Sequence, residues 1–256
     1  MLFDSHAHYD NEKFDGDRYE VISNVREKGV NYILNAASDI PSSLKCIDLS
    51  AKFDFVYAAV GIHPHSVANA GEDVVLTLSE FAGNEKVVAI GEIGLDYYYD
   101  TSPKDIQNAM FRKQLSLARD LGLPVIVHDR DAHEDTMKAI KEFPGVKGVI
   151  HCFSGSVEMA KILLEMGFYI SFGGPVTFKN AVRPGEVAKY VPIDRLLVET
   201  DCPYLTPFPY RGQRNDSGYL GIIVEKIAEL RGITYEEVAE ATFKNAVTLF
   251  KILGSI

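Results

Sequence analysis

Residues 87–92 read VVAIGE, a run of four apolar residues that ends, after one glycine, at the acidic side chain of Glu92. Residues 106–121 follow with apolar side chains at helical spacing. The next apolar run, at 124–127, is followed directly by His128. Two strand-length apolar runs with a helix between them are typical of a βαβ unit whose strands are buried on both faces of a parallel sheet. This stretch therefore predicts an α/β fold.

The same alternation continues in both directions along the chain. Eight strand-length apolar runs are separated by segments of helical length, at residues 2–3, 30–34, 55–60, 87–90, 124–127, 148–150, 169–172 and 196–198. Eight parallel strands with right-handed helical crossovers predict a TIM-type (β/α)8 barrel. A doubly wound open sheet is the alternative, but no glycine-rich phosphate-binding turn follows the first run.

Composition favours one globular unit. The 256 residues are 46% hydrophobic and 24% charged, and no linker, repeat or low-complexity tract divides them. We therefore predict a single barrel domain over residues 1–256.

The chain shows no signal of secretion or membrane insertion. The N-terminus has no basic segment, and no apolar stretch reaches the ~20 residues needed to span a bilayer. Cys46, Cys152 and Cys202 cannot all pair and show no CxxC spacing, so we expect reduced thiols. We predict a cytoplasmic protein that does not contact a membrane, with no obligate protein partner evident.

Ionisable side chains follow most of the predicted strands. In a barrel the carboxyl ends of the strands converge on one mouth, where barrel enzymes have their active sites. Six of the seven histidines lie at such ends. The complete set is Asp4, His6, His8, His63, His65, Glu92, His128, His151, Glu199 and Asp201.

These residue types indicate a metal centre. Residues two apart on a strand share a side, so His6 and His8 are expected to face one centre, with Asp4 on the same face. Imidazole and carboxylate ligands together suit zinc or manganese, and a carboxylate can bridge two ions in a hydrolytic site. The predicted ligands, enough for two partly open sites, are His6, His8, Glu92, His128, His151 and Asp201.

Four other polar residues also need an interpretation. Glu199 could ligate a metal, orient a histidine or end the barrel core, and we expect it to orient a histidine. His63 and His65 either contact substrate or pack the loop around Pro64. His133, at the start of a predicted helix, is expected on a solvated face outside the site.

The loops at the mouth add possible substrate contacts. The run from Tyr97 to Tyr99 could stack a base or pack over the barrel rim. Four basic residues in these loops either contact phosphate or form surface ion pairs: Arg130, Lys179, Arg211 and Arg214. The predicted substrate-binding set is His63, His65, Arg130 and Arg214.

At these residues the sequence resembles the TatD family of metal-dependent deoxyribonucleases, within the amidohydrolase-like barrels. Its motifs span essentially the whole chain, reading DSHAH at 4–8, GIHPH at 61–65, GEIGLDY at 91–97, HDRDA at 128–132, HCFSG at 151–155, ETDCPYL at 199–205 and RGQRN at 211–215. One departure follows Asn215, where the family often has Glu-Pro and this chain has Asp216 and Ser217. It concerns how the next helix begins.

The resemblance implies an assignment of ligands. His6, His8, Glu92 and Asp201 look like ligands of one metal; Glu92, His128 and His151 look like ligands of a second. Glu92 would bridge them, where related barrels often have a carbamylated lysine. Family members hydrolyse DNA phosphodiesters, often trimming ends, with magnesium, manganese or zinc.

The sequence thus predicts a divalent-metal-dependent deoxyribonuclease, exonucleolytic, that uses a metal-activated water at a dinuclear site. Asp201 and Glu92 are the predicted catalytic residues, with Asp201 as the proton acceptor. A formal net charge of −10 opposes binding along a nucleic acid, so contact is expected at a few nucleotides of a DNA strand end.

Two alternatives stay open. The first is a metallohydrolase of a small amide, lactone or non-nucleic phosphoester, because the same activated water could attack a carbonyl. The second is a metal-binding adaptor without turnover, which the full set of ligands disfavours.

Overall fold

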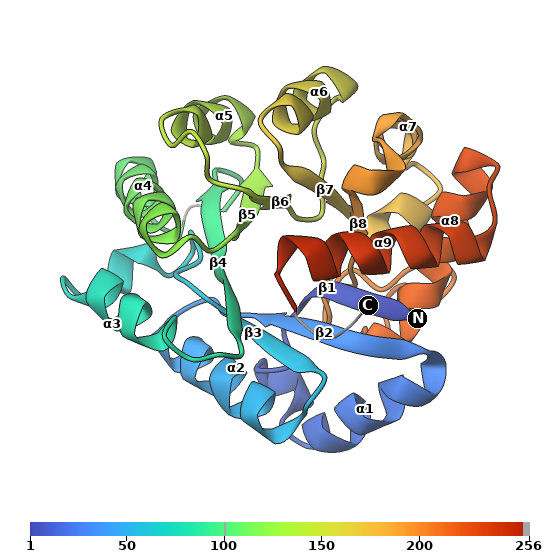
Figure 1. Cartoon of the computed structure of the whole chain (residues 1–256), viewed down its shortest axis with the longest axis horizontal. Coiled ribbons are helices and arrows are strands. Elements are labelled where there is room, and N and C mark those ends of the chain that lie inside the picture. The colour runs from blue at the N-terminus through green and yellow to red at the C-terminus, as the bar shows by residue number, and fades with distance from the viewer. Residues whose placement is uncertain (100, 253–256) are drawn as a thin grey trace.

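The computed structural model describes residues 1–99 and 101–252. Within them, eight parallel strands follow one another in chain order around a TIM-type barrel, which confirms the predicted fold (Figure 1). The strands are β1 (Leu2–Ala7), β2 (Val30–Ala36), β3 (Val56–Val60), β4 (Val87–Asp96), β5 (Val125–Arg130), β6 (Gly148–Ile150), β7 (Tyr169–Phe172) and β8 (Leu196–Val198).

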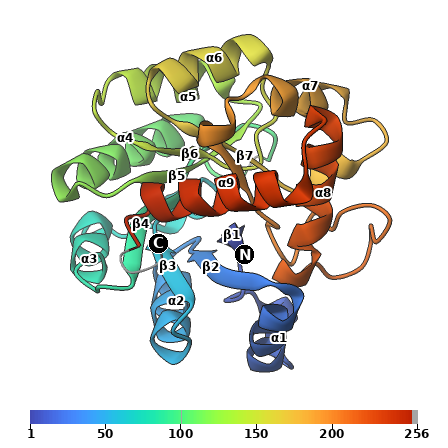
Figure 2. The ribbon, with the colours of Figure 1, turned by 45° about the vertical axis from the view of Figure 1, so that its right-hand side comes forward.

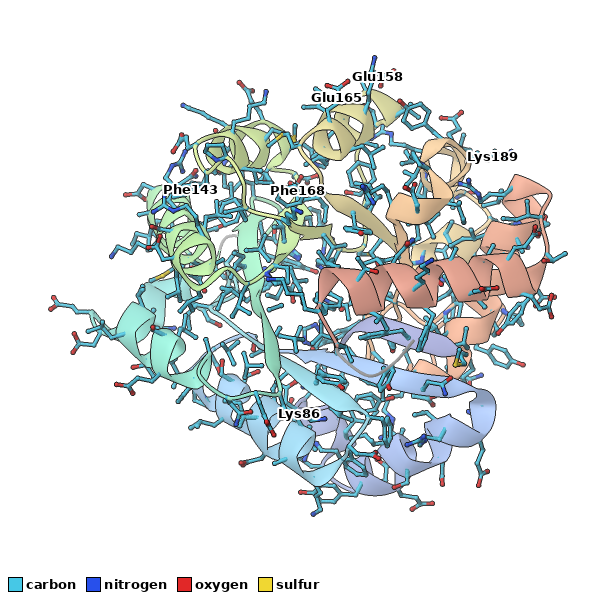
Figure 3. The ribbon with its side chains drawn as sticks, in the orientation of Figure 1. Lys86, Phe143, Glu158, Glu165, Phe168 and Lys189 are labelled. Atoms are coloured by element: carbon cyan, nitrogen blue, oxygen red, sulfur yellow. The ribbon has the colours of Figure 1, made fainter. Side chains whose placement is uncertain are left out.

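Helices follow each strand, and all of them except the last form a ring outside the barrel (Figure 1). They are α1 (Arg18–Asn24), α2 (Ile40–Lys52), α3 (Val74–Phe81), α4 (Lys104–Leu121), α5 (His133–Lys141), α6 (Val157–Glu165), α7 (Val182–Tyr190), α8 (Leu220–Arg231) and α9 (Tyr235–Leu249). Glu158 and Glu165 of α6 lie on the outer margin, whereas Phe168 is fully buried (Figure 3). The helices of the described chain all fall short of the length and apolar character that crossing a bilayer requires.

The last helix, α9, crosses one end of the barrel, close to the N-terminus (Figure 2). Phe243 of α9 and Phe250, directly after it, pack against Phe3 of β1, whose ring lies 6.4 Å from that of Phe243 and 6.0 Å from that of Phe250. This end is therefore filled with apolar side chains. The opposite end, where the strands finish, is the mouth.

The barrel closes between β8 and β1 through backbone hydrogen bonds just beyond β8. Asp201 N donates to His6 O (2.9 Å), and His8 N donates to Cys202 O (2.8 Å). The segment after the last strand is thereby fixed beside the end of the first. The hydrogen bonds that close the sheet therefore also fix part of the mouth.

The prediction that Asp4 shares a face with His6 and His8 is wrong. The pairing of β1 with β2 shifts register between Asp4 and Ala7, so the strict two-residue alternation does not hold there. The buried carboxylate of Asp4 instead accepts hydrogen bonds from Thr200 N (2.9 Å) and Thr200 Oγ1 (2.5 Å), and from Ser217 Oγ (2.6 Å). Burial raises the pKa of Asp4 to about 7.

Candidate metal centre

Glu92, within β4, turns its two carboxylate oxygens to different histidines. Oε2 lies 3.3 Å from His6 Nε2 and 3.4 Å from His8 Nε2. Oε1 lies 2.9 Å from both His128 Nδ1 and His151 Nε2. One buried carboxylate therefore joins two groups of imidazoles.

The first group consists of His6, His8 and Asp201. Asp201 Oδ1 lies 3.2 Å from His8 Nε2 and 3.7 Å from His6 Nε2, and the two imidazole nitrogens are 3.0 Å apart. These three ligand atoms lie within 4.8 Å of one another. The backbone hydrogen bonds that close the barrel hold this group together.

The second group surrounds the other oxygen of Glu92. His128, in β5, and His151, directly after β6, bring Nδ1 and Nε2 to 3.1 Å from each other. His63, after β3, places its Nε2 3.5 Å from Glu92 Oε1. The sequence suggested His63 as a substrate contact, and the structure places it at the distance of a potential ligand, together with Glu92 and His128.

Three histidines have their outer ring nitrogens held by acceptors. His8 Nδ1 lies 2.8 Å from Ala36 O, His151 Nδ1 lies 3.2 Å from Glu199 Oε1, and His128 Nε2 lies 3.1 Å from Asp96 Oδ2. An outer N–H bound in this way leaves the lone pair of the inner nitrogen free, as metal-ligating histidines require. The expected position of Glu199 behind a histidine agrees with this geometry.

The electrostatics also fit a cation. Although burial opposes it, the charges of the surrounding histidines, His151 first, hold the pKa of Glu92 well below its usual range. The pKa of Asp201 is likewise lowered, by its hydrogen bond to His8. In return, this bond and the Glu92 charge raise the pKa of His8 to about 9 despite burial. The ionised carboxylates of Glu92 and Asp201 need positive charge beside them. Protons on the histidine nitrogens that face them can supply this charge, and a divalent cation can supply it in place of those protons.

Asp96, at the end of β4, is part of the site, although sequence reasoning did not select it. Its Oδ2 lies 2.8 Å from His65 Nε2 and 3.1 Å from His128 Nε2. Its Oδ1 accepts hydrogen bonds from the backbone N–H groups of Tyr98 (2.9 Å) and Tyr99 (3.0 Å). The signal that could have revealed it is spacing, since Asp96 follows Glu92 by four residues on one strand.

The remaining predicted substrate contacts lie outside the two groups. His65 is held by Asp96, as described above. The Arg130 guanidinium lies over the ring of Tyr98, 4.0 Å from its centroid. Arg214 forms a paired hydrogen bond with the Asp17 carboxylate (2.9 and 2.6 Å), so its charge already has a partner. His133 begins α5, lies 2.8 Å from Asp129 Oδ2 and belongs to none of the groups of potential metal ligands among the described residues.

Comparisons with known proteins point in one direction. The model of the family described as TatD related DNase matches residues 3–251. A Bacillus subtilis (strain 168) protein named "Uncharacterized metal-dependent hydrolase YabD" is 48% identical over 254 residues, covering 98% of this chain and 100% of that protein. A Rahnella sp. (strain Y9602) protein named "3'-5' ssDNA/RNA exonuclease TatD" is 33% identical over 261 residues, covering 98% of each. The crystal structure of YJJV, a TatD homolog from Escherichia coli K12, is similar with a TM-score of 0.92 and 31% identity, covering 98% of both chains.

Proposed function

Because this chain belongs to the TatD related DNase family and is a metal-dependent hydrolase, we propose that it hydrolyses DNA phosphodiester bonds and removes nucleotides from strand ends. The observation that carries the proposal is the position of Glu92 between two groups of imidazoles, one on each carboxylate oxygen. Such an arrangement suits two-metal phosphoester hydrolysis. The exonuclease name of the Rahnella relative supports a nucleic acid substrate and attack at an end.

In this proposal the site would hold two divalent ions, magnesium, manganese or zinc, with Glu92 as a ligand common to both. The first would be held by His6, His8 and Asp201, and the second by His128 and His151, with His63 beside it. When bound, such ions lower the pKa of water and stabilise the oxygens of an in-line phosphoryl displacement. Glu92 relates the two groups to each other, because Oε2 contacts His6 in the first group and Oε1 contacts His128 in the second.

Asp201 is the proposed proton acceptor for the attacking water. Its low pKa keeps the carboxylate ionised, and its side chain is 13% exposed, so it faces both the first group and the open mouth. An ionised carboxylate beside the attacking water can accept its proton, although a lowered pKa makes it a weaker base than a group that titrates near neutral pH. Burial lowers the pKa of His63 to about 4, so its imidazole is neutral. A neutral imidazole can bind a metal through its lone pair or donate its N–H to a phosphate oxygen.

The charge of the chain limits how much nucleic acid it can hold. With a net charge of −10, long-range attraction of a phosphate backbone is absent, and binding depends on local cations at the mouth. We propose that Arg130 supplies such a contact. Substrate contact by His65 and by Arg214 stays a prediction from the sequence. In the structure, Asp96 already binds His65 and Asp17 already binds Arg214.

The test is hydrolysis of end-labelled single-stranded DNA by metal-stripped protein, with manganese, magnesium or zinc added back. We expect a ladder that requires metal and is lost in His6→Ala and in Asp201→Asn, while both variants keep the wild-type circular dichroism spectrum. An RNA of the same sequence, run in parallel, compares the two nucleic acids. Full activity in folded Asp201→Asn would exclude Asp201 as the base.

The acidic charge of the chain favours one second candidate, a hydrolase of a small phosphoester, amide or lactone. Small substrates do not require a basic face. A panel of such compounds, tested with the same metals, separates the two functions. Turnover of the panel with no DNA ladder under any metal would favour the small-substrate enzyme.

A further inference from the structure

Tyr98, Tyr99 and Arg130 form a cluster at the rim of the mouth, which we call the tyrosine platform. Tyr98 is 58% exposed and Tyr99 is 45% exposed. Their rings meet edge to face at 4.9 Å, and the Arg130 guanidinium lies 4.0 Å from one ring centroid and 4.8 Å from the other. Two large aromatic side chains and a cation thus face solvent together, beside a buried active centre.

Continuous contacts connect the platform with the metal centre. The Tyr99 ring lies 5.3 Å from that of His65, and the His65 ring lies 4.4 Å from that of His63. His63 Nε2 in turn lies 3.5 Å from Glu92 Oε1. A nucleotide whose phosphate is at the metal centre would therefore have the platform within reach of its base or of the neighbouring one.

The backbone of the platform is fixed, whereas its rings remain exposed. Asp96 accepts hydrogen bonds from the N–H groups of both Tyr98 and Tyr99, and the same carboxylate holds His128. The preceding tyrosine behaves differently. Tyr97 donates its hydroxyl to Asp135 and accepts a hydrogen bond from Asn108, both at 2.6 Å, and so packs the loop against α4 and α5.

Exposed aromatic rings beside a cation have a recognised use in nucleic acid binding. Unpaired bases stack on tyrosine rings and on arginine guanidinium planes, and every base offers a face for this contact. The positive charge of Arg130 also attracts the phosphates that flank such a base, which matters on an acidic chain. A base inside a duplex already stacks on its neighbours and is not available.

We propose that the tyrosine platform stacks the base of a nucleotide next to the bond that is cut, and that Tyr98 and Tyr99 determine the preference for unpaired ends. This inference rests on the proposed nuclease function and deepens it. It assigns binding of a base to the platform, whereas the phosphate is bound at the metal centre. Tyr97 serves only to position the loop.

The experiment compares a pentathymidylate with two matched oligonucleotides in which the terminal or the penultimate nucleotide is abasic. Initial rates of the first cleavage, with manganese-loaded protein, give kcat/KM for each substrate. Four proteins are compared: the unaltered chain, the double variant Tyr98→Ala/Tyr99→Ala, the conservative variant Tyr98→Phe/Tyr99→Phe, and Tyr190→Ala. Tyr190 is a matched control, because it is 44% exposed and lies at the end of α7, away from the mouth.

We expect the unaltered chain to prefer the substrate with all bases over one of the abasic substrates by roughly 5- to 150-fold, the range typical of one stacked base. The double alanine variant should lose this preference, because its kcat/KM falls much further for the complete substrate than for that abasic substrate. The phenylalanine variant and Tyr190→Ala should keep the preference. Rescue by phenylalanine identifies ring stacking as the cause.

Each other outcome has a defined meaning. If the double alanine variant keeps the full base preference, or if the unaltered chain shows none, the platform does not bind a base, although the nuclease proposal stands. If the phenylalanine variant loses the preference, the hydroxyl groups and not the rings are responsible. If the unaltered chain cleaves none of the substrates with any metal, both the platform and the nuclease proposal are wrong.

Discussion

Replacing Asp96 with asparagine changes a residue that holds His128 of the second metal group, but it substitutes no predicted metal ligand. The carboxylate accepts two imidazole contacts at Oδ2 and two backbone N–H groups at Oδ1. An asparagine has one acceptor oxygen, so one of these two pairs must face an NH₂ group instead. Asp96→Asn therefore loses either the contacts with His128 and His65 or the hydrogen bonds from the backbone N–H groups of Tyr98 and Tyr99.

The size of the effect follows from what Asp96 holds. Losing the acceptor behind a metal-ligating histidine commonly weakens metal binding 10- to 100-fold, which corresponds to about 1.4–2.8 kcal/mol. We expect a loss of this size at the second group, which contains His128. The first group, His6, His8 and Asp201, has no contact with Asp96 among the described hydrogen bonds and ion pairs and should keep its affinity.

Titration of metal-stripped protein with manganese, followed by electron paramagnetic resonance, measures the two affinities. Asp129→Asn is the matched control, since Asp129 also accepts a histidine N–H at 2.8 Å, from His133, but outside the metal groups. The reasoning fails if Asp96→Asn binds both ions as tightly as the unaltered chain. It also fails if the two sites weaken equally, or if Asp129→Asn weakens the second site as much.

Three further changes test the fold around the site. Because burial raises the folded-state pKa of Asp4 from 3.8 to about 7, the folded chain binds that proton more tightly than the unfolded chain, so stability should fall as pH rises from about 4 to 7. Asp4→Asn should remove this decline, at most roughly 4 kcal/mol, in urea unfolding measured across that range, and equal slopes for the two proteins would contradict it. Phe3→Ala should lower the free energy of unfolding by about 3–5 kcal/mol while manganese affinity stays constant, and a change below 1 kcal/mol would show that the filled barrel end contributes little. A Cβ on Gly94 would lie 2.0 Å from the His128 carbonyl oxygen, and φ is +139° there, so Gly94→Ala should destabilise the fold and weaken metal binding in calorimetry, whereas Gly16→Ala, with no atom within 4 Å, should behave as the unaltered chain.

The strands and most of the site could be predicted because both depend on a simple period. Apolar runs of strand length marked all eight strands, and polar residues at their ends marked the mouth. Four strands, β1, β2, β4 and β5, continue beyond the end of their apolar runs. For example, β4 continues through Glu92 to Asp96, because residues at the mouth remain in the sheet although their side chains are polar.

What the sequence did not predict depends on neighbours distant along the chain. The direction of the Asp4 side chain follows from the register of β1 against β2, which no period within β1 contains. Asp17, the partner of Arg214, lies almost two hundred residues earlier in the sequence. The two residues meet because the barrel closes between its last strand and its first. His63 is near Glu92 because β3 pairs with β4 and places Val60 opposite Ile90, and the spacing of the two histidines around Pro64 alone could not show this.

The most direct test of a dinuclear centre is the anomalous scattering of crystals grown with manganese. The proposed dinuclear centre predicts two peaks in each chain, one beside His6, His8 and Asp201 and one beside His128 and His151, each within ligand distance of a different oxygen of Glu92. Crystals of Glu92→Gln serve as the comparison and should lose at least one peak. A single peak in the unaltered chain, or peaks away from Glu92, would contradict the account.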